Sequence, residues 1–213
     1  MTAPSPTLYA NTTVTSTTVR VKDAWSACDA DGLTSYKLQR QVSGGTWSTV
    51  SLSTALTTSI NQSLTKGKTY RYRVRATDKS GLVSSYSYGP SFQAIVSDQT
   101  SSLISYTGAW STGTSSSYFG GTSKYSTSPG ASATYTINAS GAAWIAYKSS
   151  TRGTAQVFVD GVLKATINLN TSTATARAQV YAVNWGANGL HTVKVVVVSG
   201  RVDIDAFVRL VRV

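Results

Sequence analysis

No segment of this 213-residue chain longer than about ten residues places its apolar side chains at the spacing of an α-helix. Residues 69–76 instead alternate at every position between apolar or aromatic side chains and polar ones. That alternation is typical of a half-buried β-strand. Glutamate, a strong helix former, does not occur in the chain. The sequence therefore predicts an all-β protein, and the inward-facing residues of this strand are Tyr70, Tyr72, Val74 and Ala76.

The length of the chain exceeds what one small β-sandwich needs and fits two domains of about 100 residues each. A short polar segment without proline, residues 98–103, lies near the middle of the sequence. We predict two tandem β-sandwiches, over residues 1–97 and 104–213, joined by that segment as a linker. Because the linker is short, the two domains should keep a preferred relative orientation.

The first half carries further signs of a sandwich. Residues 35–40 alternate like residues 69–76, and Trp25 and Trp47 are large enough to fill a core between two sheets. Glycine-containing pairs that favour turns separate the predicted strands. These turns are expected at residues 31–32, 44–45 and 66–67.

A basic face is predicted on the solvent side of the same strands. Arg71, Arg73 and Arg75 alternate with the inward-facing residues, and Lys37 should lie on the neighbouring strand of that face. The simpler interpretation is a face that meets only solvent. The alternative is an acidic partner, because three arginines in register repel one another unless an anion lies against them.

Three motifs of the first half point to a known fold: a tryptophan, a Tyr-x-Leu-x-Arg strand and a Leu-x-x-Gly-x-x-Tyr corner. They are formed by Trp25, by residues 36–40, and by Leu64, Gly67 and Tyr70. On these motifs residues 5–96 resemble a fibronectin type III domain, although Lys66 stands where that family usually has proline. The resemblance implies a spacer or adhesion platform and assigns no chemistry.

The second half is also predicted to consist of strands. An Asp-Gly pair at 160–161 suits the turn of a hairpin between two of them. Residues 111–128, rich in Ser, Thr, Gly and Tyr, are predicted to form a long loop that contains aromatic side chains. The predicted strands are residues 133–137, 143–147, 155–159, 162–169, 189–198 and 202–210.

The order of these strands is accompanied by four short motifs. They are residues 106–110, 153–161, 189–193 and 202–207. On these motifs residues 103–213 resemble the galactose-binding-like jelly rolls attached to many secreted bacterial proteins. That resemblance implies a second β-sandwich of a class whose members commonly bind sugars, although many are structural. The two kinds of module also recur as neighbours in bacterial surface proteins.

A sugar site needs aromatic faces for the ring and polar groups for the hydroxyls. Aromatic residues in or beside predicted loops, together with one arginine, meet that need. The alternative is that the tryptophans among them lock loops onto the sandwich. His191 is interpreted as a structural histidine. The candidate glycan-binding residues are Trp110, Tyr118, Phe119, Tyr125, Arg152 and Trp185.

Catalysis finds little support in the sequence. The chain has one histidine, one cysteine (Cys28) and no glutamate, and no Gly-x-Ser-x-Gly motif or second acidic cluster accompanies them. We therefore predict no enzyme activity and no cofactor. Asp203 and Asp205 are the only candidates for a structural Ca²⁺, and a hydrogen bond to the loops or an ion pair with arginine is the competing interpretation. Cys28 is predicted to be a buried free thiol.

The formal net charge is +11 and is spread evenly over the chain. Residues 1–98 hold ten Lys and Arg against five Asp, and residues 99–213 hold nine against three. This balance favours acidic partners or serves solubility alone. No motif for specific nucleic-acid binding occurs, and no window reaches the about 18 apolar residues that would insert into a membrane.

The predicted location follows from the N-terminus and the two resemblances. Both halves resemble modules found outside cells, whereas residues 1–14 lack the basic start and apolar run of a secretory signal. A bacteriophage virion accessory protein, on capsid or tail, reconciles these observations. We predict a non-catalytic protein of the virion surface that projects a glycan-binding module, with other virion proteins, cell-surface glycans and further copies of itself as partners. The alternative is a secreted, extracellular bacterial carbohydrate-binding or adhesion module without its parent enzyme.

Overall fold

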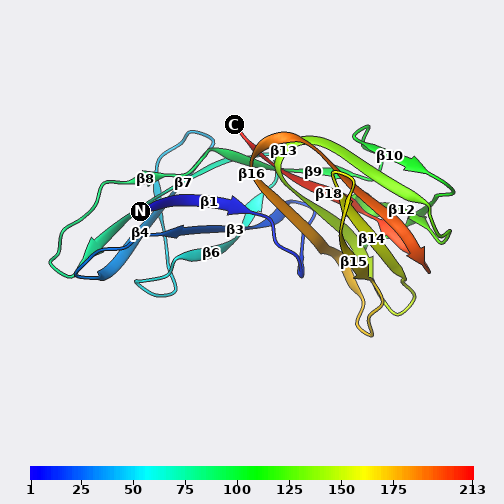
Figure 1. The fold of residues 1–213 in the computed structure, drawn as a ribbon, viewed down its shortest axis with the longest axis horizontal. Coiled ribbons are helices and arrows are strands. Elements are labelled where there is room, and N and C mark those ends of the chain that lie inside the picture. Colours follow the sequence, from blue (N-terminus) through cyan, green and yellow to red (C-terminus); the bar gives the residue numbers. More distant parts are fainter.

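A computed structural model describes all residues from 1 to 213 (Figure 1). Nearly all regular structure is β-strand, which confirms the predicted all-β class. The first half contains β1 (Thr2–Thr7), β2 (Thr12–Thr13), β3 (Thr18–Ser26), β4 (Leu33–Val42), β5 (Ser48–Val50), β6 (Ser59–Thr65), β7 (Thr69–Asp78), β8 (Ser87–Tyr88) and β9 (Phe92–Asp98). The second half contains β10 (Ile104–Thr107), β11 (Ser111–Thr114), the short 3₁₀ turn η1 (Phe119–Gly121), β12 (Thr122–Ser126), β13 (Ser132–Lys148), β14 (Thr154–Val159), β15 (Val162–Asn168), β16 (Thr175–Ser199), β17 (Val202–Ile204) and β18 (Ala206–Arg212).

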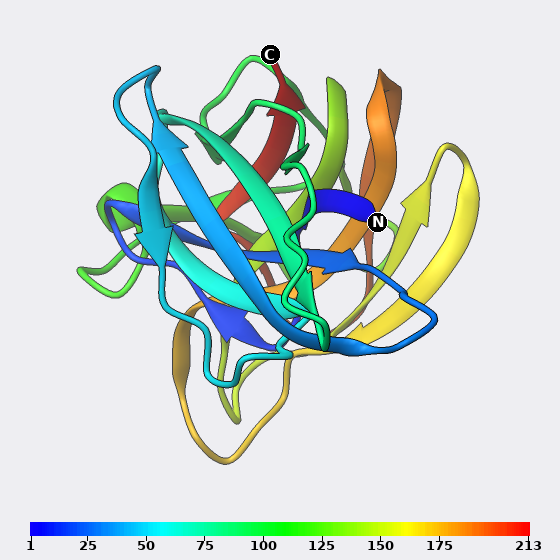
Figure 2. The same ribbon diagram turned by 90° about the vertical axis from the view of Figure 1, so that its left-hand side faces the viewer.

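The first half is a sandwich of the sheet β1-β3-β6 and the strands β9, β7, β4 and β5. Figure 2 looks onto this end of the molecule. The alternation of β7 places its even-numbered residues, from Tyr70 to Ala76, in the core, as predicted, and leaves its arginines on the outer face. Trp25, Leu38 and Leu64 pack against them from the other strands.

The second half has its own core between the strands β13, β14, β16 and β18 and the small sheet β11-β12-β17. Trp144 is fully buried at its centre, and the rings of Tyr135 and Phe207 stack with centroids 4.7 Å apart. The Asp160-Gly161 hairpin between β14 and β15 forms where it was predicted.

One sheet continues through both halves. β9 pairs with β18 in unbroken antiparallel register from Phe92–Arg212 to Asp98–Ala206, so the strands form a single twelve-stranded sheet. The apolar cluster of the first half includes Ile145 and Leu210 of the second half. Residues 99–103 of the predicted linker form turns. The two halves are thus joined by a shared sheet and a shared core as well as by the chain, and together they form an arch (Figure 1).

Several predicted elements differ in the structure. Residues 111–128 are not one loop, because β11 and β12 pair with each other around η1. Residues 133–147 form one strand with bulges, and the strand predicted at 189–198 begins much earlier, at Thr175. Trp47 lies on the outer face of the first half, and Cys28 is exposed in the turn region after β3. The chain forms no helix that could span a lipid bilayer.

Candidate functional site

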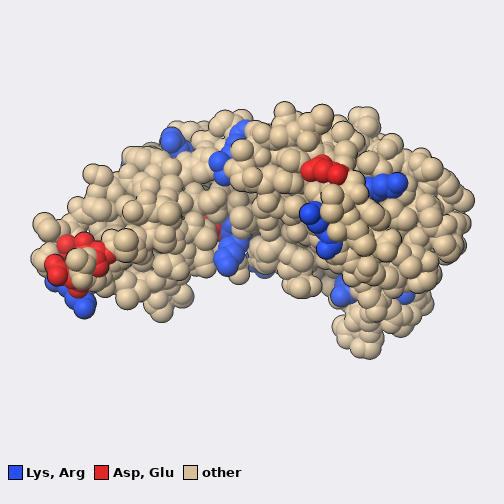
Figure 3. All heavy atoms as spheres, viewed as in Figure 1, with Lys and Arg blue, Asp and Glu red and all other residues tan.

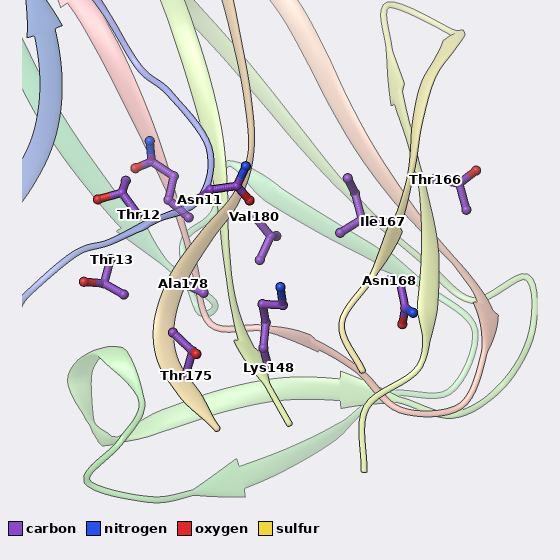
Figure 4. A pocket seen from close by; sticks show the side chains of 11 residues that line it. Asn11, Thr12, Thr13, Lys148, Thr166, Ile167, Asn168, Thr175, Ala178 and Val180 are labelled. Atoms are coloured by element: carbon purple, nitrogen blue, oxygen red, sulfur yellow. The ribbon is translucent and has the colours of Figure 1, made fainter. Parts of the chain in front are cut away.

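A polar pocket of about 400 Å³ lies where the N-terminal segment of the first half meets the second half (Figure 4). In Figure 4, Lys148 and Ile167 point into the space between the strand that carries Val180 and the strand that carries Asn168. The pocket is lined by Asn11, Thr12, Thr13, Lys148, Thr166, Ile167, Asn168, Thr175, Ala178, Gln179 and Val180.

Strand pairing between the halves builds one wall of this pocket. β2 pairs with β16 through Thr12 and Thr13, and the backbone N–H of Asn11 donates to the carbonyl of Gln179 over 2.9 Å. The pairing of β16 with β13 shifts register here, and Arg177 has a left-handed φ of 51°. Such bulges bend a strand and re-aim its side chains at the rim of a sheet. The pocket is therefore a product of the junction between the two halves.

The chemistry of the pocket suits a small polar ligand rich in hydroxyl groups. Its walls offer amides, threonine hydroxyls and the ammonium of Lys148 beside an aliphatic patch that includes Ile167, and no carboxylate or aromatic ring lines it. Gln179 is fully buried; its Nε2 donates to the carbonyl of Tyr9 over 2.6 Å, and its Oε1 has no partner. Donors and acceptors arranged in this way fix the orientation of a small polar ligand.

The sugar candidates from the sequence lie in separate places, and none of them lines a pocket. Tyr118, Tyr125 and Arg152 come together around Asp203, whose carboxylate is fully buried. This carboxylate accepts from Arg152 and, over 2.8 Å, from Nη2 of Arg201. Both arginines also donate to the hydroxyl of Tyr118, over 3.2 and 3.0 Å. The donors of Arg152 are thus taken up within the protein.

Phe119 belongs to the core and not to the surface. Its side chain is 8% exposed and packs in the apolar cluster shared by the two halves, with the ammonium of Lys66 4.6 Å from the ring centroid. Its N–H donates to Oδ1 of Asp205 over 2.7 Å. The prediction of an open aromatic loop failed here because η1 folds back against the first half.

Trp110 and Trp185 lie in two other places, and both pack against the apolar core of the second half. Trp110 meets the edge of Tyr106 with centroids 5.1 Å apart and donates from Nε1 to the carbonyl of Thr107. Trp185 stacks flat on His191 at 3.8 Å, and Nδ1 of His191 lies 2.8 Å from Oδ2 of Asp160. Both tryptophans are half-buried, in keeping with the alternative that they hold loops onto the sandwich.

The calcium candidates have other partners. Asp203 is neutralised by two guanidinium groups, and burial raises the pKa of Asp205 to about 7. A Ca²⁺ ion is bound by roughly six to eight oxygen ligands, which include carboxylates, carbonyls and water. No group of three or more His, Cys, Asp or Glu side chains is close enough to hold a metal. The two carboxyl groups thus have the partners of the competing interpretation, an ion pair with arginine and a hydrogen bond to the loop.

The four residues of the predicted basic face do lie together. Lys37 pairs with Arg75 across β4 and β7, and the guanidinium carbon of Arg73 lies 4.3 Å from the ring centroid of Trp47 and 4.1 Å from that of Tyr86. The rings were missed in the sequence because β8, which positions Tyr88 opposite Arg73, is only two residues long. The pocket residues were missed as well, since isolated Asn, Thr and Lys residues from distant segments carry no sequence signal.

Comparison with known proteins gives partial matches. The sequence matches no known protein-family profile. It is 35% identical over 126 residues to an A type blood N-acetyl-alpha-D-galactosamine deacetylase of Flavonifractor plautii, a match that covers 57% of this chain and 16% of that enzyme. It is 33% identical over 112 residues to an A type blood alpha-D-galactosamine galactosaminidase of the same organism, covering 53% of this chain and 10% of that enzyme. The chain thus spans a small part of the length of these curated relatives.

Solved structures show similarity at lower identity. The CBM36-1 domain of a multidomain xylanase from the hindgut metagenome of Trinervitermes trinervoides is 15% identical with a TM-score of 0.39, and the match covers 55% of this chain and 95% of that domain. A two-domain esterase active on acetylated mannans is 14% identical with a TM-score of 0.45, covering 56% of this chain and 37% of that protein.

Proposed function

We propose that this chain is a non-catalytic glycan-binding module and that the pocket between its two halves holds a neutral sugar. The observation that carries the proposal is the set of amide, hydroxyl and ammonium groups around an aliphatic patch in a pocket of about 400 Å³. Groups of this kind exchange hydrogen bonds with sugar hydroxyls, and the aliphatic patch suits the C–H groups of the ring.

The absence of carboxylates from the pocket wall supports binding rather than hydrolysis. A glycosidase places two carboxyl groups about 5 to 10 Å apart on either side of the scissile bond. Asp203 and Asp205 are buried outside this pocket, in contact with arginine and with a backbone N–H. The relatives named above are enzymes that are much longer than this chain, and we propose that the chain corresponds to a binding part of such a protein.

The names of the two relatives suggest the glycan to test first. One is named for N-acetyl-α-D-galactosamine and the other for α-D-galactosamine. Because Lys148 brings a positive charge to the pocket, we expect the neutral N-acetylated sugar to bind more tightly than the free amine, which is a cation at neutral pH.

The test is calorimetric titration of the full chain with an A-type trisaccharide and with its deacetylated form. Lys148→Ala and Asn168→Ala should each weaken binding of the acetylated sugar about tenfold, because each removes a polar contact to the ligand. Lys164→Ala, an exposed change on the same strand as Asn168 and outside the pocket, should leave the affinity unchanged. If both pocket variants bind the sugar unchanged, or if Trp110→Ala or Trp185→Ala loses sugar binding instead, the sugar does not bind in this pocket.

A second proposal, from the sequence, places the chain on the surface of a phage particle, with an extracellular location as its alternative. The feature that favours it is the arch made stiff by a sheet that runs through both halves, which suits a projecting component. A density gradient of lysate from the source, followed by peptide mass spectrometry, tests it. Co-migration with particles at a fixed copy number supports the virion location, and a purely soluble signal contradicts it.

A further inference from the structure

The outer face of β7 carries a ladder in which arginines alternate with aromatic rings. The guanidinium carbon of Arg71 lies 5.1 Å from the ring centroid of Tyr88, and that of Arg75 lies 5.0 Å from that of Tyr86. Arg73, between them, contacts both tyrosine rings and Trp47. We call these six residues, with Lys37 beside Arg75, the arginine ladder. It lies in the first half, and none of its residues lines the polar pocket.

No carboxylate neutralises the ladder. The two ion pairs of the protein, which join Arg152 and Arg201 to Asp203, lie in the second half, as does the contact of His191 with Asp160. On the face drawn in Figure 3, acidic side chains gather at the tip of the first half. Alternate residues of a strand are about 7 Å apart, so three guanidinium groups follow one another closely along β7. The rings offset part of their mutual repulsion through cation–π contact and leave the net charge in place.

The ladder is held in position before any ligand arrives. Arg73 donates from Nε to Oε1 of Gln39 and from Nη1 to the hydroxyl of Tyr88, each over 2.9 Å. Arg71 donates from Nε to the carbonyl of Gly89 over 3.1 Å. These bonds fix the guanidinium planes and leave further N–H groups without a partner in the protein. A fork that is already oriented loses less entropy when it binds an anion.

The chemistry of this surface selects among anionic partners. Carboxylate and sulfate groups match the paired N–H groups of a guanidinium. Single-stranded nucleic acid would in addition stack its bases on open aromatic faces. Here guanidinium groups already lie over the rings of Trp47, Tyr86 and Tyr88. We propose that the arginine ladder binds an anionic polysaccharide through its carboxylate or sulfate groups, at a site separate from the neutral-sugar pocket.

The first experiment measures binding of the full chain to polygalacturonate, dextran sulfate and neutral dextran, with oligothymidylate as the nucleic-acid probe. Binding to polygalacturonate, to dextran sulfate or to both, with none to dextran, supports the proposal and tells carboxylate from sulfate recognition. The affinity should fall several-fold or more between roughly 50 and 200 mM salt, because exposed charges are screened. Failure to bind either polyanion, or tighter binding of oligothymidylate than of both, overturns the proposal.

Two matched double variants distinguish binding at the ladder from a general effect of the net charge of the protein. Arg71→Gln with Arg75→Gln removes two ladder charges and should weaken polyanion binding about tenfold. Arg20→Gln with Lys22→Gln removes two exposed charges from β3, in the other sheet of the same half, and should change it less than about twofold. Equal losses in the two variants would overturn the proposal. Arg73 is left intact because three rings pack on it. Neutral-sugar binding should be unchanged in both variants, so the proposal for the ladder and the proposal for the pocket are tested independently.

Discussion

Asp23 is a buried acidic residue of the first half, and its burial is unfavourable when the carboxyl group is ionised. Its side chain is fully buried on β3, and neither carboxylate oxygen has a hydrogen-bond partner. Burial raises the pKa of Asp23 from 3.8 to about 8. The hydroxyl of Tyr72 is also without a partner, and its pKa is raised first by burial and then by the nearby charge of Asp23. At pH 7 the carboxyl group is therefore mostly protonated in the folded protein.

A pKa that is higher in the folded state makes stability depend on pH. Below about pH 4 the carboxyl group is protonated in both states and does not affect the free energy of unfolding. Between about pH 4 and 8 the unfolded chain loses this proton while the folded protein keeps it, so stability falls as pH rises. Above about pH 8 the group is ionised in both states, and the free energy of unfolding stays at its lowered value.

We predict that Asp23→Asn raises the free energy of unfolding by roughly 2 to 4 kcal/mol at pH 7 and by little at pH 4. The amide has nearly the shape of the protonated acid and cannot ionise. Thermal or urea unfolding at pH 4, 6 and 8 measures the effect. Asp31→Asn, the same substitution at an exposed position, is the control. A gain that is equal at all three pH values, or one that appears in the control too, would contradict the explanation.

At the scale of elements, Asp203 holds together the start of β14, the turn before β17 and β17 itself. Arg152 precedes β14 and Arg201 precedes β17, and the side chains of the two arginines are 9% and 26% exposed. The two segments also approach closely at the backbone, since a Cβ atom at Gly153 would overlap the carbonyl oxygen of Ser199. The buried carboxylate is thus the charge that makes this close approach of two cations tolerable.

Unequal burial predicts an order of destabilisation for this network. Asp203→Asn should cost about 3 kcal/mol or more, because it leaves two partly buried cations unpaired. Arg152→Met should cost less than Asp203→Asn, and Arg201→Met the least, since Arg201 is the more exposed arginine and Asp203 keeps its other partner. Urea unfolding of the three variants gives the order. An Arg201→Met protein as unstable as Asp203→Asn would mean that the pair with Arg152 contributes little.

The sequence was sufficient for elements whose pattern is local. Strict alternation predicted β7 and the burial of Tyr72, and the Asp160-Gly161 pair predicted the hairpin of β14 and β15. It failed where distant pairing decides. β11 and β12 are composed of Ser, Thr and Gly and form strands because they pair with each other and, for β12, with β17. Trp47 was predicted in the core because its size favours burial. It lies on the outer face instead, where its ring packs on the guanidinium of Arg73 through a cation–π contact.

The candidate site was less predictable than the fold. Lys37 and the arginines of β7 were found from alternation alone, because the face of a strand is a local property. The pocket combines Asn11, Lys148 and Asn168, which are far apart in sequence and become neighbours only when β2 pairs with β16. Nothing in the local sequence marks such residues. Sites formed at a junction of two halves are therefore outside the reach of motif-based reasoning.

At the scale of the whole molecule, the junction resembles the interior of a domain. β9 and β18 pair along seven residues of each strand. The side-chain amide of Asn184 donates to the carbonyl of Leu8 and accepts from its N–H, over 2.9 and 2.8 Å. Val208 and Leu210 of the second half are fully buried in the apolar cluster of the first. Unfolding of the first half alone would expose this apolar surface and leave one edge of β18 unpaired.

We therefore predict that the two halves unfold as one cooperative unit. A substitution that destabilises the first half should then also speed hydrogen exchange in the second half. Leu38→Ala removes a fully buried side chain from β4, which β7 separates from β9 in the shared sheet, and should cost about 3 kcal/mol. If unfolding is cooperative, the slowest amides of β13 and β14 should exchange hydrogen roughly a hundredfold faster, as do those of β4 and β7. Hydrogen exchange followed by mass spectrometry reads the peptides of the two halves separately. Leu163→Ala, at a side chain that is 48% exposed on β15, should change neither set by more than about threefold. Faster exchange confined to the first half would instead mean that the shared sheet joins two units that unfold independently.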